Sequence, residues 1–258
     1  MTEPKQSTLE EIIESERTLM LTAEQRYGKY YIHARGCSVF LSQCITSFEH
    51  DRLMFARFFS LMKKHHMLAL LSFCRLHRVQ GMMNLRQVLE AGAAAAFALV
   101  QPDVKHFADI DDQGILDPSQ DLARKRYTWL DQHYPDKSAT IKKKKDLIND
   151  QSAHANVVNS EAIFKINAAG DATHQPFFDI EDEYRVKGDL LLMSGIALEL
   201  ADLLYGVNMD LKVIEFVSDF TAYVRHAAKE NETLLAEMKS TDRFKRAIEK
   251  YGDPSART

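Results

Sequence analysis

Glycine and proline are scarce in this sequence, with 10 and 6 residues in a chain of 258. Turn-rich β folds need many of both, so this scarcity favours helices. The most apolar long stretch, residues 79–101, still contains Asn84, Arg86, Gln87 and Glu90. A membrane-spanning helix tolerates such side chains poorly, so we interpret the stretch as a buried helix of a soluble protein and expect no membrane partner.

Cysteine is also rare: the sequence has three, Cys37, Cys44 and Cys74, and all lie within helical patterns. An odd number of cysteines without a secretory leader indicates a reduced, cytoplasmic protein without a disulfide framework. Residues 1–16 contain no basic segment followed by an apolar run, so no signal peptide is predicted.

Neither sign of charge dominates, because 33 Lys and Arg face 37 Asp and Glu, for a formal net charge of −4. A nucleic-acid-binding surface needs clustered cations to neutralise phosphates, so nucleic acid is not an expected partner. The one basic run, Lys142 to Lys145, is interpreted as a solvated helix face. The chain shows no internal repeat or linker, which favours a single domain over 1–240 and a polar, loosely ordered tail over 241–258.

The spacing of apolar residues predicts an all-α, multi-helix bundle with long amphipathic helices and one small β-hairpin insertion. Two capping-box patterns, Ser7-x-x-Glu10 and Thr8-x-x-Glu11, mark the start of the first helix. Helices are then expected at 9–26, onward to about 49 with a bend at Gly28, from 51 to 101 with breaks near His65–His66 and at Gly81, at 119–132, from Ser138 through 147–158, at 182–205 closed by Gly206, and at 210–239.

Two segments are predicted to be non-helical. Residues 102–121 are polar and read as a loop. Residues 162–178 change character, with two short apolar runs around Ala169-Gly170-Asp171, and predict the β-hairpin. The AGAAAAFALV run that precedes the loop is apolar on all sides, so its helix end is expected to be central and closely approached by neighbours.

A cluster of polar residues lies within the predicted helical segment LINDQSAHANVV, residues 147–158. Asp150 and His154 are four residues apart and share a face, where the carboxylate can hydrogen-bond the imidazole. Ser152 points about 200° away from His154 in a regular helix, so the two do not form a nucleophile–base pair. Ser152 is expected to bond its own backbone or a neighbouring helix, and His154 to lie at the edge of the core.

A charged pair, Arg86 and Glu90, falls in an apolar sector of its helix with Met82 and Leu89. Buried charges need partners, because leaving either alone costs several kcal/mol. One interpretation is a structural ion pair that fixes helix register. The other is that Arg86 presents its planar fork to a carboxylate or phosphate, or to the cluster around His154.

The pattern LHRVQGMMNLRQVLEAG, followed by SAHAN on a later helix, resembles groups of uncharacterised bacterial helical proteins over about residues 52–205. Their shared marks are an Arg-x-x-x-Glu on one long helix and a Ser-x-His on a later one, at Arg86, Glu90, Ser152 and His154 here. The resemblance implies a helical bundle and locates a site without assigning an activity.

A more distant similarity is to HEPN domains, helical bundles that include RNA-cleaving toxins and carry an Arg followed by four to six residues and a His. Arg26 to His33 and Arg126 to His133 fit this spacing. His154 lacks an arginine at the required spacing. Chance alone gives about two such matches in a chain of this composition.

Two places have part of a metal-site pattern, but no metal or cofactor is predicted. The loop from Asp109 to Gln120 has part of the calcium-loop rhythm, but Gln120 stands where a bidentate glutamate is needed. A solvated loop is the preferred interpretation. His33, Cys37 and Cys44 share a helix face that could hold zinc, yet their spacing is also that of a core stripe.

Two functional hypotheses remain. The first is a non-enzymatic binding or regulatory module in which Arg86, Glu90 and His154 form a buried polar cluster. The second is an enzyme or nucleotide- or RNA-handling protein in which Arg86 binds an anion and His154 is the general acid or base. A small anionic ligand is compatible with both, and the long amphipathic helices suggest a homodimer.

Overall fold

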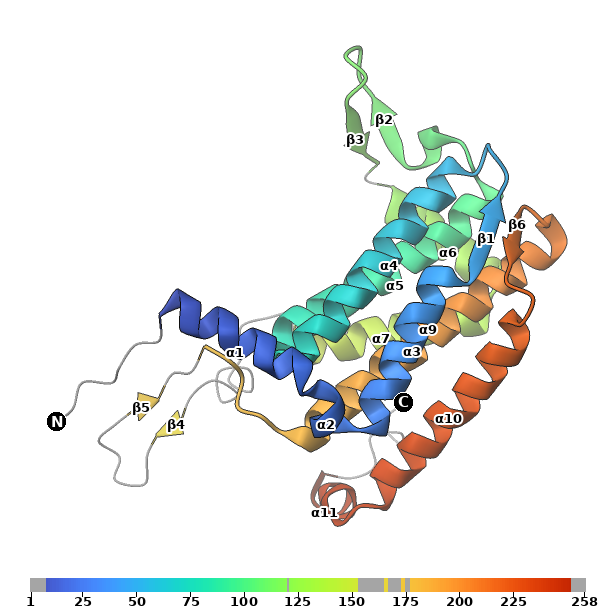
Figure 1. Ribbon diagram of the computed structural model, residues 1–258. Coiled ribbons are helices and arrows are strands. Elements are labelled where there is room, and N and C mark those ends of the chain that lie inside the picture. The colour runs from blue at the N-terminus through green and yellow to red at the C-terminus, as the bar shows by residue number, and fades with distance from the viewer. Residues whose placement is uncertain (1–7, 120, 153–164, 167–172, 175–176, 252–258) are drawn as a thin grey trace.

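The computed structural model describes residues 8–119, 121–152, 165–166, 173–174 and 177–251. These residues form an all-α bundle with small paired strands, as predicted (Figure 1). The elements, in chain order, are α1 (Leu9–Leu21), α2 (Ala23–Tyr27), α3 (Lys29–Gln43), β1 (Ile45–Phe48), α4 (Leu53–Cys74), α5 (Arg78–Val100), a 3-10 turn (Val104–His106), β2 (Ala108–Ile110), β3 (Leu116–Pro118), α6 (Leu122–His133), α7 (Pro135–Ser152), β4 (Lys165–Ile166), β5 (Thr173–His174), α9 (Glu183–Leu211), β6 (Ile214–Phe216), α10 (Phe220–Ser240) and α11 (Asp242–Tyr251).

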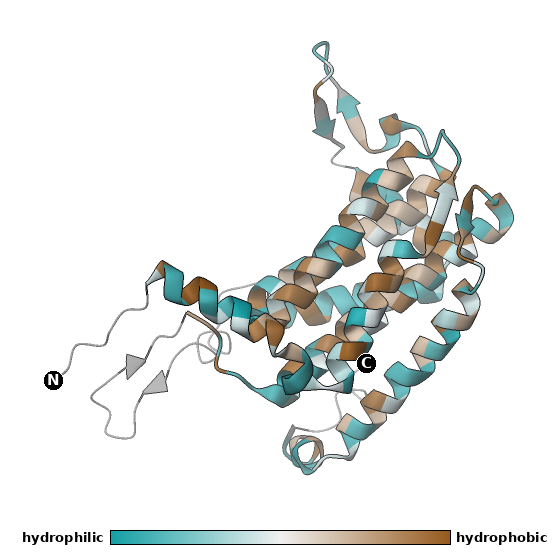
Figure 2. Ribbon diagram, viewed as in Figure 1, coloured by the Kyte–Doolittle hydropathy of each residue, from teal (hydrophilic) through white to brown (hydrophobic). Residues whose placement is uncertain are grey.

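The core is built around α9, which packs against α3, α4, α5 and α10. The alanine-rich end of α5 is buried there, as its composition predicted. The helices approach closely at Gly92, where a Cβ would lie 2.6 Å from Leu200 Cδ1 and 3.0 Å from Met62 Sδ. A side chain at this position would therefore collide with both α9 and α4. Figure 2 shows long hydrophobic stretches on α4, whereas hydrophobic and hydrophilic residues alternate along the peripheral α10.

Helix α9 is long and apolar enough to cross a membrane by length and composition, but 67% of its most apolar window is buried within the protein. That burial is the pattern of a core helix. It is the one such helix among the described residues.

The predicted breaks at His65–His66 and Gly81 are wrong, because α4 and α5 run through both positions. His66 is buried and its ring nitrogens have partners, so it does not interrupt the helix. Gly81 lies against the Phe73 ring, where a Cβ would come within 2.4 Å. The chain instead reverses at residues 75–77, where Leu76 has a φ of 61°.

The first helices also differ from the prediction. Thr8 and Glu11 form the expected capping box. Gly28 ends α2 and precedes α3 with a φ of 54°, so it separates two helices where a bend was expected. The helix predicted to reach residue 49 ends at Gln43, because residues 45–48 form β1 and pair antiparallel with β6.

Strand β6 also displaces the predicted ends of the last two long helices. Helix α9 continues past Gly206 to Leu211, and α10 begins at Phe220, about ten residues later than expected. Asn208 holds the turn between them: its side-chain oxygen accepts from the backbone N–H groups of Val213 and Ile214 at 2.8 and 3.0 Å.

The hairpin predicted within 162–178 is confirmed by the antiparallel pairing of β4 with β5. A second pair, β2 with β3, lies inside the segment predicted to be a loop and projects from one end of the bundle (Figure 1). The predicted polar tail contains a further helix, α11, in which Arg243 pairs with Asp182 at the start of α9.

Candidate functional site

Helices α5 and α7, which carry the two predicted halves of the polar cluster, pack against each other. Their contact includes an ion pair in which Lys145 Nζ lies 3.1 Å from Glu90 Oε1. Arg86 Nε is 3.5 Å from the same oxygen, and the Arg86 side chain is 40% exposed. The expectation that Arg86 and Glu90 lie in the core is therefore wrong. They lie at its edge, where Glu90 links the two helices.

The carboxylate of Glu90 is surrounded by cations. Burial alone would raise its pKa, but the hydrogen-bonded Lys145 ammonium, with Arg126 and Arg86, outweighs that effect and holds the pKa below its ordinary value. Glu90 is therefore an ionised structural anion at neutral pH, and it is unsuited to act as a general acid there.

The buried Arg126 of α6 completes this cluster. Its Nη1 donates to the backbone oxygen of Glu90 at 2.9 Å, and its guanidinium carbon lies 4.8 Å from the centre of the Tyr127 ring. Lys145 lies at the same 4.8 Å from that ring. The Glu90 cluster, defined as Arg86, Glu90, Arg126, Tyr127 and Lys145, thus joins α5, α6 and α7.

The remaining predicted residues lie at the end of α7 or beyond it. Asp150 is exposed. Ser152 is the last residue of α7, and its side chain is outside the described part of the chain, as is all of His154. The Asp150–His154 contact and the role of Ser152 therefore stay predictions.

The two arginine–histidine pairs with HEPN-like spacing have separate partners. Arg26 binds Glu181 at 2.7 Å, whereas His33 contacts Glu230 and Asn231 of α10. Arg126 belongs to the Glu90 cluster, and His133 contacts the backbone oxygen of Trp129 at 3.0 Å.

The basic run from Lys142 to Lys145, in the middle of α7, is not merely a solvated face. Its lysines and the nearby Lys137 pair with carboxylates of three other helices: Lys137 with Asp202, Lys142 with Asp131, Lys144 with Glu199 and Lys145 with Glu90. Only Lys143 of this run is exposed without an ion pair among the described residues. These pairs fasten α7 to α5, α6 and α9.

A buried ion pair that the sequence analysis did not identify joins α5 to α9. Arg78 Nε and Nη2 lie 2.8 and 3.2 Å from the carboxylate oxygens of Asp189. Burial raises the pKa of Asp189 to about 6, although Arg78 acts in the opposite direction. Arg78 and Asp189 lie on different helices far apart in the sequence, so no local spacing pattern indicated the pair.

In the part of the chain that the structure describes, neither the loop that begins at Asp109 nor the helix face of His33, Cys37 and Cys44 is arranged as a metal site. Asp111 Oδ1 already accepts from the backbone N–H groups of Gln113 and Ile115 at 2.9 and 2.8 Å, which closes the β2–β3 turn. Cys37 and Cys44 are buried core residues. Within the described residues, no three His, Cys, Asp or Glu side chains are grouped to hold a metal ion.

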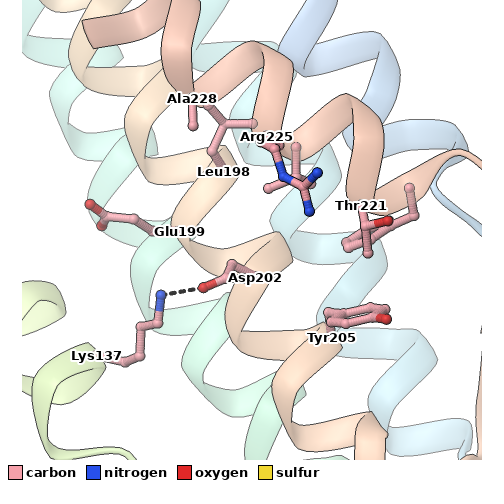
Figure 3. Close-up of a pocket in the computed structure, with 10 residues that line it drawn as sticks. Lys137, Leu198, Glu199, Asp202, Tyr205, Thr221, Arg225 and Ala228 are labelled. Carbon is pink, nitrogen blue, oxygen red and sulfur yellow. Dashed lines mark hydrogen bonds and ion pairs between the residues drawn. The ribbon is translucent and has the colours of Figure 1, made fainter.

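A groove of about 420 Å³ lies between α9 and α10 beside the start of α7. This is within the size range of small-molecule sites. Figure 3 shows its lining side chains. We call it the α9–α10 groove, and it is lined by Lys137, Leu198, Glu199, Asp202, Tyr205, Phe220, Thr221, Val224, Arg225 and Ala228.

The periodicity of α10 explains how it forms one wall of the groove. Thr221, Val224, Arg225 and Ala228 are spaced by three and four residues and so share one helix face. At the end near Thr221, the Tyr205 ring stacks on Phe220 with centroids 5.1 Å apart and planes at 14°. The wall is therefore mostly apolar with one guanidinium.

The charges of the α9–α10 groove are unevenly paired. Asp202 binds Lys137, and Glu199 binds Lys144 at 2.6 Å. Arg225 has no ion pair or hydrogen bond from its side chain within the described residues, and Figure 3 shows its guanidinium directed into the groove. An exposed arginine on an amphipathic helix is common, so the residue pattern around Arg225 does not indicate a site.

No protein-family model matches this chain, and neither a curated protein nor a solved structure matches it significantly.

Proposed function

We propose that this protein is a non-enzymatic binding or regulatory module that holds a small ligand in the α9–α10 groove. One observation carries the proposal: this groove combines an apolar wall with a guanidinium that no described residue neutralises. Sites for small molecules are commonly apolar clefts with a few polar groups that orient the ligand.

The contacts of the Glu90 cluster support a structural role for Arg86 and Glu90, which the sequence suggested as candidate catalytic residues. Its carboxylate is already bound by Lys145, and Arg126 is committed to a backbone oxygen. The enzymatic alternative, with Arg86 binding an anion and His154 as acid or base, stays a prediction because His154 is outside the described residues.

A thermal-shift screen of a chemically diverse compound library tests the proposal, since a ligand that binds only the folded state raises its melting temperature. Ala228→Trp places an indole in the groove and is the matched control. We expect compounds that stabilise the wild-type protein and lose this effect in Ala228→Trp. If every stabilising compound acts equally on both proteins, the groove is not the site.

Screening Arg86→Ala in parallel separates the two hypotheses. A binding module with its site in the α9–α10 groove responds to the same compounds with or without Arg86. Compounds whose stabilising effect is lost in Arg86→Ala but kept in Ala228→Trp would favour the enzymatic alternative.

The predicted homodimer is also kept as a proposal. Ile32 and Val39, one face of α3, are 47% and 44% exposed and line a second groove, of about 450 Å³, against Tyr223 of α10. Exposed apolar side chains on the same helix face are suited to packing against a second copy of the chain.

A further inference from the structure

The charge of the α9–α10 groove limits the ligands that fit it. Its two carboxylates, Glu199 and Asp202, are each neutralised by a lysine of α7. Arg225 leaves one positive charge in surplus. A ligand with a single negative charge matches this balance, whereas a cation meets net repulsion.

The shape and charge of the Arg225 guanidinium favour one class of anion, a carboxylate, over a phosphate. The guanidinium of Arg225 is a planar fork that binds a carboxylate through two parallel hydrogen bonds. A phosphate monoester carries about −1.5 to −2 charges at pH 7, more than the single surplus cation neutralises. Thr221 lies one turn before Arg225 on the same face, and its hydroxyl is a further donor with no hydrogen bond among the described residues.

The wall of the groove defines the rest of the ligand. Leu198, Val224 and Ala228 contribute aliphatic surface beside Arg225. Tyr205, which stacks on the buried Phe220, contributes a flat aromatic ring at the end near Thr221. Apolar side chains and aromatic rings bind apolar, flat groups by burial and by offset or edge contacts.

We propose that the ligand of the α9–α10 groove is a monocarboxylate with an apolar, flat body, bound by Arg225 at the carboxylate and by the Tyr205 ring at the body. This inference rests on the proposed function and names the ligand class of the same site. It assigns the charge recognition to a residue of α10, distant in sequence from the motif arginine, Arg86.

Isothermal titration of the full chain with 3-phenylpropanoate tests the proposal, and 3-phenylpropylamine, 3-phenylpropanol and 3-phenylpropyl phosphate are the matched probes. They share one body and differ in the head group. We expect the carboxylate to bind at least tenfold more tightly than the other three. Equal or tighter binding of the amine, the alcohol or the phosphate overturns the proposal, as does no binding of the carboxylate at millimolar concentration.

Variants of α10 locate the charge recognition. Arg225→Ala should weaken 3-phenylpropanoate binding at least tenfold, and Arg225→Lys, which keeps the charge without the fork, at least threefold. Both changes are at an exposed side chain and leave the core intact. Lys229→Ala, one turn further along α10 and outside the groove, should bind as the wild type does. Unchanged binding in Arg225→Ala overturns the proposal.

The outcomes also separate this inference from the proposed function. If library compounds lose their effect in Ala228→Trp while 3-phenylpropanoate does not bind, the groove is a ligand site of another class. If no compound is sensitive to Ala228→Trp, the proposed function fails as well. Ala228→Leu fills the groove with a smaller side chain and replaces the tryptophan variant if the latter does not fold.

Discussion

The ammonium of Lys145 lies 3.1 Å from the carboxylate of Glu90 and fastens α7 to α5. Both side chains are mostly buried, so removal of the lysine leaves an anion that is only partly solvated. We expect Lys145→Ala to lower the free energy of unfolding by about 1–2 kcal/mol, between the values for exposed and fully buried pairs, as measured by urea denaturation.

Lys143 provides the matched control, because it belongs to the same run but is exposed without an ion pair among the described residues. Lys143→Ala should change stability by less than about 0.5 kcal/mol. Arg86→Ala should also cost little, because its contact with Glu90 is longer and its side chain is 40% exposed. Equal losses in all three variants would contradict the assignment of Lys145 as the structural partner.

The buried Asp189 should make the protein less stable as the pH rises. Its pKa is raised from the ordinary 3.8 to about 6 in the folded state, so the folded protein holds this proton more tightly than the unfolded chain. Its contribution to the free energy of unfolding is therefore lost between about pH 4 and pH 6, by roughly 3 kcal/mol at most. Melting curves at several pH values over this range should show that the stability of the wild type falls with rising pH relative to that of Asp189→Asn.

The buried His66 should have the opposite effect. In its neutral form it donates from Nε2 to the backbone oxygen of Met193 at 3.1 Å, which leaves Nδ1 facing the Ser38 hydroxyl at 3.0 Å. Burial lowers the pKa of His66 from 6.5 to about 4. The unfolded chain then binds the proton first, so this contribution is lost as the pH falls from 6.5 towards 4.

The two buried groups therefore oppose each other between pH 4 and pH 6, and their effects should largely cancel in the wild type. His66→Gln should remove the loss at acid pH and expose the opposite slope from Asp189. Chemical denaturation at half-unit steps of pH measures both slopes. A stability profile that is identical in both variants and the wild type would show that neither group titrates as its burial predicts.

The homodimer proposal predicts twice the monomer mass by size-exclusion chromatography with light scattering at micromolar concentration. Val39→Asp places a charge on the exposed face of α3 and should yield monomers. Met209→Asp, on an even more exposed apolar residue at the end of α9, should leave the mass unchanged. A monomeric wild-type protein would refute the proposal.

Sequence patterns predicted the presence of the long helices because their periodicity is local. They failed at positions whose conformation depends on distant residues. His66 looked like a break, but its partners Ser38 and Met193 lie on other helices. Gly206 looked like a helix end, but the chain turns later, where Asn208 binds the backbone of Val213 and Ile214.

The candidate site, like the fold, was only partly predictable from the sequence. The rule that Glu90 needs a partner was correct, but its interhelical partner, Lys145, belonged to a run that resembled a solvated face. Arg225 could not be identified from the sequence, because what marks it is the absence of an ion-pair partner among the described residues. A missing neighbour is a property of the packed structure and cannot be deduced from residue spacing.

The pairing of β1 with β6 has a consequence for the newly made chain. Ile45 and Phe216 are partners that lie far apart in the sequence, so β1 has no strand to pair with until β6 has left the ribosome. Contacts of such large sequence separation form slowly, because a long loop must close before they contribute. We therefore expect chains truncated before residue 214 to remain open at this edge and to need protection from aggregation during synthesis.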